Sequence, residues 1–233
     1  MNYPNQYLDL CLEGSSSVFK GLNQKDKETI AQHYSTAVVN RGGFLFTEGD
    51  KTRGLIYLLA GKVKVFKTGV GEREQILRMI KPGEIIGYRT LFSENIWSVS
   101  AKAIENSIIC TLEKRCMVRI IKKNADLGFR LLRAISEELW YSYDRTVSLT
   151  QKHVRGRVAE SLLLLSDTYG FEQEEKTIAV SLSREEVANL SSMTPSNAIR
   201  TLSNFTKEGI IRIKGRKITI LDMDSLVQIS EFA

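Results

Sequence analysis

The sequence predicts an α+β protein with three parts: an N-terminal antiparallel β-roll of the jelly-roll type, a long helix, and a C-terminal winged helix-turn-helix. Three observations support this prediction. Short strand-like runs separated by glycines fill residues 42–113, a helical pattern without proline continues to residue 151, and two capped helices with a basic hairpin follow. A chain of 233 residues is long enough for two domains of ordinary size.

The strand-like runs recur at close spacing. They are FLFTEGD, GLIYLLAG, KVKVFKTGVG, EQILRMIKPG, EIIGY, WSVSAKA and NSIICTLE. Many short strands with glycine-rich turns are typical of a small antiparallel barrel or jelly roll. We assign residues 1–125 to this roll, with a flanking helix at its N-terminal side, and expect the roll to sense an effector.

One of these runs, KVKVFK, shows a clear alternation of apolar and basic residues. Strict alternation is the pattern of a strand with one buried and one solvated face. We therefore expect Val63 and Val65 to point inward, and Lys62 and Lys64 to point into solvent.

A helical period replaces the strand pattern after the last of these runs, and we place a long helix at residues 126–152. Positions spaced by three and four residues form a heptad seam on it: Leu132, Ile135, Leu139, Ser142, Thr146 and Leu149. A seam of this length needs a partner. We expect Leu132, Ile135, Leu139 and Leu149 to face the same helix of a second copy in a homodimer. The alternative is that the helix lies on its own roll.

Two helix starts can be read near the C-terminal end. Ser183 to Glu186 has the S-x-x-E pattern of a capping box. Thr194 is a suitable N-cap for the next helix, and Pro195 suits its first position because the N–H of that residue has no acceptor within a helix. The short break between the two helices makes this segment a helix-turn-helix.

The second of these helices has distinct apolar and polar faces. The apolar face consists of Ala198, Leu202 and Phe205, and the polar face of Ser196, Arg200, Ser203 and Lys207. Gly209 ends the helix, and IRIKGRKITI then predicts two strands around a basic turn. Residues 153–233 are thus expected to form a winged helix-turn-helix.

The positive charge is concentrated in this segment. The net charge of the chain is +6, residues 151–233 hold 11 basic and 11 acidic residues, and residues 200–217 hold six basic residues and one acidic residue. A basic helix and hairpin suit a nucleic-acid partner. The sequence therefore predicts a DNA-binding surface at residues 200–217.

The second helix is narrow enough to enter the major groove of DNA. Arg200 can donate two hydrogen bonds to O6 and N7 of guanine, so we expect it to read a base. The expected contacts to phosphates are Lys207, Arg216 and Lys217, together with backbone amides at the helix starts, Ser183 and Thr194. The alternative is that Arg200 and Lys207 only solvate an exposed helix face.

Over nearly the whole chain the sequence resembles the Crp/Fnr family of bacterial transcription regulators. The residues that carry the resemblance are FLFTEGD, LIYLLAGKVKVF, PGEIIGYRTLF, VRGRVAESLLLL and SREEVANLSSMTPSNAIRTLSNFTKEGII. The resemblance implies a cyclic-nucleotide-binding-like roll, a dimerisation helix and a homodimer on a palindromic DNA site. It also implies a small-molecule effector that modulates DNA binding, and contact with RNA polymerase.

The same resemblance places the effector pocket at Gly87, Tyr88, Arg89, Trp97, Ser98, Ser142 and Tyr143. In the cyclic-AMP-responsive branch, a Gly-Glu pair holds the ribose and an Arg-Ser pair holds the cyclic phosphate. Here Tyr88 follows Gly87, and Trp97 stands where the arginine is expected. Because a buried phosphate would lack its main charge partner, we do not expect tight binding of cyclic AMP.

Two further alternatives at the pocket stay open. Arg89 can approach an anionic ligand from the neighbouring position. Ser142 and Tyr143 match hydroxyls that touch the purine in that branch, but Ser142 and Thr146 can equally be polar seam residues that set the dimer register. The effector itself is not predicted.

The recognition helix departs from the family as well. The family often has Arg or Val followed by Glu where this chain has Pro195 and Ser196, while Arg200 matches the later arginine. Ser196 and Asn197 are expected to read bases less strictly than a glutamate does. The resemblance therefore supports one strict base contact, at Arg200.

The cysteine and histidine counts argue against metal chemistry. The iron–sulphur branch of the family needs four cysteines, mostly near the N-terminus, and only Cys11 lies there, so no cluster is expected. A cupin-type enzyme needs several converging histidines, and the chain has only His33 and His153, both outside the strand-like runs. We predict that the chain is not an enzyme and binds no metal.

A third class is a cyclic-nucleotide-type sensor that acts on a protein partner, which would explain the roll but not the winged helix. No apolar run is long enough to span a bilayer. The polar start MNYPNQYLDL lacks the basic and apolar regions of a signal peptide. We therefore expect a cytoplasmic protein without a membrane partner.

Overall fold

The computed structural model describes residues 6–14, 17–93, 95–172 and 175–232. They fall into two compact units. The first comprises residues up to 67 together with 80–140, and the second comprises 68–79 together with the chain from 141 onward. None of the helices in the described ranges is both long and apolar enough to cross a membrane. The division into parts 1–125, 126–152 and 153–233 stays a prediction.

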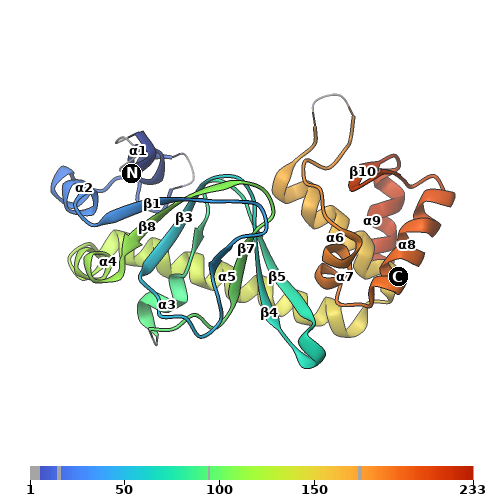
Figure 1. Cartoon of the computed structure of the whole chain (residues 1–233), viewed down its shortest axis with the longest axis horizontal. Coiled ribbons are helices and arrows are strands. Elements are labelled where there is room, and N and C mark those ends of the chain that lie inside the picture. Colours follow the sequence, from blue (N-terminus) through green and yellow to red (C-terminus); the bar gives the residue numbers. More distant parts are fainter. Residues whose placement is uncertain (1–5, 15–16, 94, 173–174, 233) are drawn as a thin grey trace. The chain divides into compact units, whose positions relative to one another are not determined.

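The roll consists of two four-stranded sheets (Figure 1). One has the order β1(Tyr34–Val39), β8(Ser107–Glu113), β3(Gly54–Ala60), β6(Ile85–Ile86), and the other β2(Phe44–Phe46), β7(Ser100–Ala103), β4(Val63–Thr68), β5(Glu74–Ile80). A short 3-10 turn, η1(Val70–Glu72), joins β4 to β5. Strand β8 pairs antiparallel with β1 and β3, β3 with β6, and β7 with β2 and β4. The predicted fold class is confirmed.

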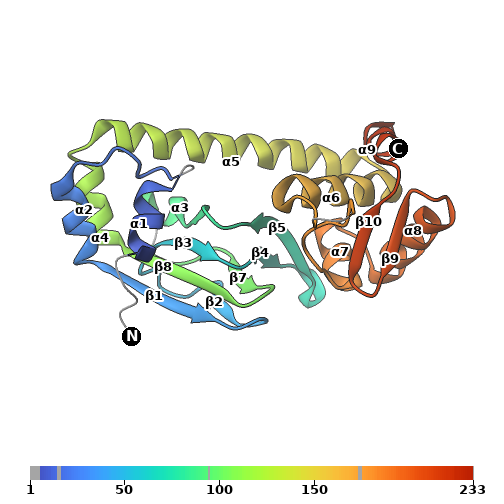
Figure 2. The ribbon, with the colours of Figure 1, turned by 90° about the horizontal axis from the view of Figure 1, so that it is seen from above.

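Helices cover the outer face of the first sheet (Figure 2). They are α1(Gln6–Glu13), α2(Gln24–Ala31), α3(Tyr88–Phe92), α4(Lys114–Ile121) and the start of α5(Ala125–Gln151). Alternate residues of β3 and β8, among them Leu55, Tyr57, Cys110 and Leu112, point into the same core as Leu127 and Leu131 of α5. Successive side chains of a strand point to opposite sides of the sheet, so every second residue of β3 and β8 faces the helices.

The prediction that β4 has a solvated face is wrong. Val63, Lys64, Val65 and Phe66 are all buried, and Lys64 is only 5% exposed, with its ammonium nitrogen 5.3 Å from the ring centroid of Phe66. Neighbouring strands cover only the edges of a strand, so the burial of consecutive residues shows that both faces of β4 are packed against other side chains from Val63 to Phe66. Lys62 also departs from the expectation, because Glu105 accepts two hydrogen bonds from it, 2.8 and 3.0 Å long.

The predicted long helix is α5, whose bounds differ by one residue from the predicted 126–152. The amide of Leu127 donates to Oδ1 of Asn124 at 2.9 Å, which satisfies one amide at the start of α5 and separates it from α4. Of the predicted seam, Leu132 and Leu139 are 59% and 51% exposed. Ile135 and Leu149 are half-buried.

The second unit contains the predicted winged helix-turn-helix. Its elements are α6(Val154–Tyr169), α7(Arg184–Leu190), α8(Pro195–Lys207), the hairpin β9(Ile211–Lys214) and β10(Lys217–Ile220), and α9(Met223–Phe232). Helix α6 packs against α9 and α8. Val158, Leu162 and Leu165 give α6 a buried face, as helical spacing requires.

Candidate nucleic-acid interface and effector pocket

The start of α7 is held by a complete capping box. The hydroxyl oxygen of Ser183 accepts from the amide of Glu186 at 3.1 Å, and the carboxylate of Glu186 accepts from the amide of Ser183 at 2.8 Å. These bonds satisfy two amides that a helix start leaves without partners. The short helix therefore begins at a fixed residue.

The start of α8 is also capped by a side chain. Thr194 is the N-cap, its hydroxyl oxygen accepts from the amide of Asn197 at 3.4 Å, and Pro195 occupies the first turn. Ala198, Leu202 and Phe205 are fully or almost fully buried. Helix α8 is thus anchored by its apolar face, and its opposite face is left for solvent or a partner.

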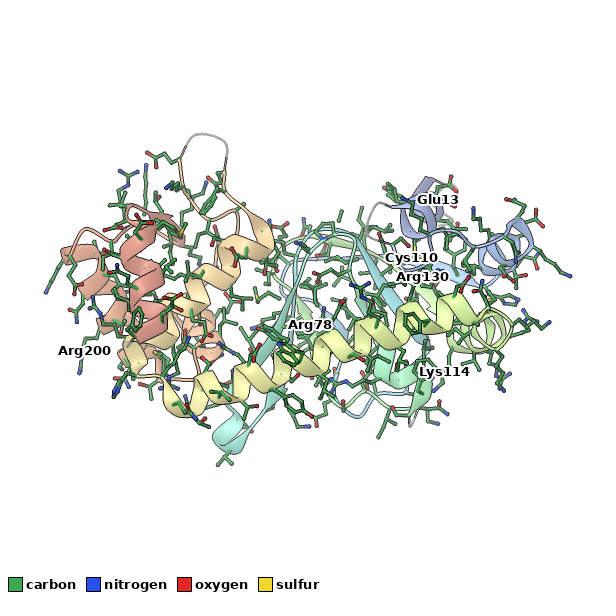
Figure 3. The ribbon with its side chains drawn as sticks, turned by 180° about the vertical axis from the view of Figure 1, so that it is seen from behind. Glu13, Arg78, Cys110, Lys114, Arg130 and Arg200 are labelled. Carbon is green, nitrogen blue, oxygen red and sulfur yellow. The ribbon has the colours of Figure 1, made fainter. Side chains whose placement is uncertain are left out.

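The outward face of α8 carries the predicted base-reading residues. Ser196, Arg200, Ser203 and Lys207 are exposed, and Asn197 is half-buried. In the part of the chain that the structure describes, no hydrogen bond or ion pair engages the side chains of Arg200 and Lys207. Figure 3 shows Arg200 extending away from the helix.

An apolar residue on this face was missed by the sequence interpretation. Ile199 is 50% exposed and lies three residues after Ser196 and four before Ser203. An exposed methyl-bearing side chain among polar ones can contact the C5-methyl group of thymine. Its signal in the sequence is an isoleucine outside the i, i+4, i+7 apolar set.

Hydrogen bonds from α6 hold the turn between α7 and α8 in place. The hydroxyls of Ser161 and Ser191, both completely buried, are joined by a 2.8 Å hydrogen bond. Arg157 donates to the carbonyl of Ser192 at 2.8 Å, and Ser192 has a φ of +51°, a left-handed conformation unusual for a residue with a side chain. These contacts set the direction in which α8 leaves the turn.

The hairpin turn at Gly215 and Arg216 forms the predicted wing. Arg184, which sequence analysis did not single out, donates to the carbonyl of Gly215 at 3.0 Å and so ties the turn to α7. Arg216 is exposed. Lys217 is exposed as well, but its ammonium group lies 2.7 Å from a carboxylate oxygen of Glu172. A phosphate must therefore displace Glu172 to bind Lys217.

The predicted effector pocket is brought together only in part. Gly87 has a φ of +104°, and a Cβ at this position would lie 2.7 Å from Cη2 of Trp97. The Trp97 indole is 5% exposed and stacks on Phe46 with ring centroids 3.7 Å apart. The tryptophan thus packs directly against the position where the resemblance places a ligand.

The remaining pocket residues are spread over exposed positions. Tyr88 is half-buried, and Ser98 is exposed. A guanidinium nitrogen of Arg89 lies 3.9 Å from a carboxylate oxygen of Glu138, and the Arg89 side chain is 58% exposed. Ser142 and Tyr143 are exposed on the part of α5 that belongs to the second unit.

The cysteines are buried thiols. Cys11, Cys110 and Cys116 are 0–3% exposed. The hydrogen bond that the Cys11 thiol donates to Cys110, together with burial, raises the pKa of Cys11, so that this thiol stays protonated. No group of three or more His, Cys, Asp or Glu side chains suited to a metal occurs among the described residues.

Two family models match the chain. The cyclic nucleotide-binding domain matches residues 37–124, which hold the roll, and the Crp-like helix-turn-helix domain matches residues 156–229, which hold α6 to α9. Together they account for about two thirds of the sequence. Each matched range coincides with one of the architectures described above.

Curated relatives match over most of their length. The CRP-like cAMP-activated global transcriptional regulator of Mycobacterium tuberculosis is 25% identical over 215 residues, covering 91% of this chain and 96% of the relative. The fumarate and nitrate reduction regulatory protein of Escherichia coli K12 is 26% identical over 195 residues, covering 82% and 77%. Both are regulators rather than enzymes, which supports the prediction that this chain is not an enzyme and argues against the cupin alternative.

A solved structure shows the same fold. FixK2 from Bradyrhizobium japonicum superposes with a TM-score of 0.76 at 20% identity, and the match covers 86% of this chain and 98% of that one. Similarity at this level of identity concerns the fold alone. It supports the assignment of roll, long helix and winged helix-turn-helix made from the sequence.

Proposed function

Because the chain belongs to the Crp/Fnr family of DNA-binding transcription regulators, we propose that it acts in the cytoplasm as a homodimer on a palindromic DNA site. A small-molecule effector in the roll modulates that binding, and the bound dimer contacts RNA polymerase. In this proposal residues 1–125 sense the effector, residues 126–152 pair the two copies, and residues 153–233 bind DNA.

The observation that carries the DNA-binding role is the outward face of α8. Arg200 is exposed and has no partner among the residues that the structure describes, while the opposite face of the same helix is buried. A guanidinium held on a rigid, capped helix can donate two hydrogen bonds to guanine in the major groove. Ser196, Asn197, Ile199 and Ser203 are the neighbours that contact adjacent bases.

Phosphate contacts surround this face. The exposed cations Lys207 and Arg216 bind phosphates directly. Lys217 binds a phosphate once its ion pair with Glu172 is broken. The backbone amides at Ser183 and Thr194 are neutral hydrogen-bond donors to phosphate. Such contacts fix the register of the protein on the duplex without reading its sequence.

The dimer role rests on α5. Along this helix Phe129, Leu132, Leu139, Trp140, Tyr143 and Val147 are each more than half exposed. Apart from the adjacent Leu139 and Trp140, these residues recur at spacings of three, four and seven. Exposed apolar residues at such spacings on one long helix favour pairing with a second copy. The aromatic members extend the seam read from the sequence, whose apolar members were Leu132, Ile135, Leu139 and Leu149 and whose polar members were Ser142 and Thr146.

The effector is proposed to differ from cyclic AMP, although the M. tuberculosis relative is described as cAMP-activated. Trp97 replaces the arginine that neutralises the cyclic phosphate, and its indole packs against Gly87 and Phe46. Arg89, next to Tyr88 in the sequence, lies close to Glu138. A calorimetric titration with cyclic AMP should show no micromolar affinity, and saturable micromolar binding would contradict this.

The DNA-binding proposal is tested by selecting bound duplexes from a random pool and measuring affinity by fluorescence anisotropy. Arg200→Ala should cost about 1–3 kcal/mol on the selected site and relax the preference at one base pair. Lys207→Ala is the matched control: it should weaken binding to every duplex and lower the salt dependence by about one ion.

Two results would overturn the proposal. Failure of the folded wild-type chain to bind any duplex at low salt would remove the DNA-binding function. Equal weakening of all sequences by Arg200→Ala would remove the base-reading role and leave only a phosphate contact at this residue.

A further inference from the structure

A large cationic groove lies at one end of the roll, within the first unit. Its cavity has a volume of about 1070 Å³ and is formed by β1, the segment between β2 and β3, Asn95, and the junction of β8 with α4. The basic residues that line it are Lys51, Arg53, Lys114, Arg115, Arg119, Lys122 and Lys123. None of the predicted effector or DNA-binding residues lines this cavity. We call it the cationic groove.

The positive charge of the groove is almost uncompensated. Among the described residues that line it, Glu113 is the one carboxylate, and it already lies 3.2 Å from Nδ1 of His33. Lys114 donates to the carbonyls of Thr90 and Ser93, and Figure 3 shows it at the start of α4. Within the described ranges, no carboxylate forms an ion pair with the six other cations.

Two walls supply these cations. Lys51 and Arg53 lie on the segment that leads into β3. Arg115 and Arg119 on α4 and Lys122, the C-cap of α4, follow at i, i+4 and i+7. Such spacing places the three side chains on one face of the helix. The opposite face of α4, with Cys116, Met117 and Ile120, is buried in the core. The cationic face of α4 is therefore held in position by the packing of its other side.

Neutral donors and a second cavity adjoin the cations. Ser35, Thr52 and Asn95 also line the cationic groove. A smaller cavity of about 560 Å³ shares Lys51, Thr52, Arg53 and Thr111 with it and continues to the carboxylate of Asp50 and to the apolar side chains of Phe46, Ile56 and Trp97. A ligand with anionic groups and an apolar part can therefore contact the cations of the groove and these apolar side chains at the same time.

We infer that the cationic groove is a ligand site, separate from the DNA-binding surface, for a small molecule that carries two or more phosphate groups. Cations on two walls can each bind a different phosphate, and charge-assisted hydrogen bonds to phosphate are the strong ones. The groove has the dimensions of a small-molecule site. An extended macromolecular anion such as an acidic peptide has the same charge but does not need the adjoining apolar side chains of Phe46, Ile56 and Trp97.

The test uses isothermal titration calorimetry on the full chain without DNA, with inorganic tripolyphosphate as the probe in a buffer free of divalent cations. Two double variants each remove two charges from one wall: Lys51→Gln with Arg53→Gln, and Arg115→Gln with Lys122→Gln. Lys20→Gln with Lys25→Gln is the matched control, because these lysines are exposed and line neither cavity. Because no DNA is present, the result does not depend on the proposed function.

We expect saturable binding by the wild-type chain and by the control, and a loss of affinity of at least about tenfold in each double variant. Circular dichroism checks that the variants stay folded. Absence of saturable binding by the wild type, or equal affinity in all four proteins, would overturn the inference. A loss from one wall alone would reduce the site to a surface patch. Saturation by hexaglutamate but not by tripolyphosphate would mean that the partner is an acidic protein segment.

Discussion

Arg155 and Glu208 connect the first turn of α6 to the residue that caps α8. The guanidinium donates two hydrogen bonds to the carboxylate, one of them 2.7 Å long, and its carbon lies 4.7 Å from the ring centroid of the buried Phe205. The pair therefore holds the C-terminal end of the proposed recognition helix. The hydrogen bond from Arg155 lowers the pKa of Glu208 below its ordinary value.

This pair predicts a pH dependence of stability. Because the folded-state pKa of Glu208 is depressed, the stabilisation is present above the unfolded pKa and is lost as pH falls through the folded pKa. Glu208→Gln should lower the free energy of unfolding by about 0.5–1 kcal/mol near neutral pH, since the pair is partly exposed. Urea unfolding should show this difference shrinking as pH is lowered below about 4. A constant difference across that range would show that the charge of Glu208 plays no part.

Gly87 and Trp97 predict a packing effect in the roll. Gly87→Ala adds a Cβ 2.7 Å from Cη2 of Trp97 and forces a side chain into φ +104°. The left-handed backbone alone costs about 1–2 kcal/mol, and the clash adds to it. Gly42→Ala is the matched control, because Gly42 has a φ of +81° with nothing within 4 Å of the added Cβ. Gly87→Ala should be the more destabilising of the two in thermal unfolding.

The clash can be separated from the backbone strain by a double-mutant cycle. Trp97→Phe removes the part of the indole that approaches Gly87, so Gly87→Ala should cost less in the Trp97→Phe background than in the wild type. Identical costs in the two backgrounds would mean that the added Cβ does not meet the tryptophan.

The proposed dimer can be tested by a substitution at Leu139. It is 51% exposed on α5, and Leu139→Glu would place a charge in the proposed seam, so sedimentation velocity should show monomers where the wild type forms dimers. Arg133→Gln changes the charge by the same amount on the same helix, at a residue whose side chain is 76% exposed, and should leave the dimer intact. An unchanged dimer in Leu139→Glu would place the contact elsewhere.

The cap at Ser183 is expected to stabilise the helix-turn-helix. Ser183→Ala removes the acceptor for the amide of Glu186 and should lower the free energy of unfolding by about 1 kcal/mol. Glu186→Gln keeps an oxygen that can accept from the amide of Ser183, so it should cost less. Hydrogen exchange at the first amides of α7 should report the same order, and equal exchange in both variants would show that the cap contributes nothing.

Much of the fold could be predicted because local pattern and tertiary position agree. The S-x-x-E pattern, Thr194 before Pro195, and apolar residues at helical spacing define α7 and α8 without reference to the rest of the chain. The face of α8 that carries Arg200 followed from the same spacing.

The exceptions depend on residues far apart in the sequence. The alternation at Lys64 is that of a half-solvated strand, but β4 is buried on both faces from Val63 to Phe66. Arg184 reaches the hairpin turn at Gly215, and the cationic groove joins Lys51 to Arg115 and its neighbours on α4. No local pattern carries these contacts, because strand order and helix docking decide them.

The order of strands in the first sheet has a consequence for synthesis of the chain. Strand β8 lies between β1 and β3, with Tyr34 opposite Leu112, whereas the C-terminal hairpin pairs Lys214 with Lys217. Pairing between distant segments is slow and leaves strand edges open. Until residue 107 and the strand that follows it have left the ribosome, β1 and β3 of a nascent chain lack the strand that lies between them. The C-terminal hairpin is made last and can form without any distant segment.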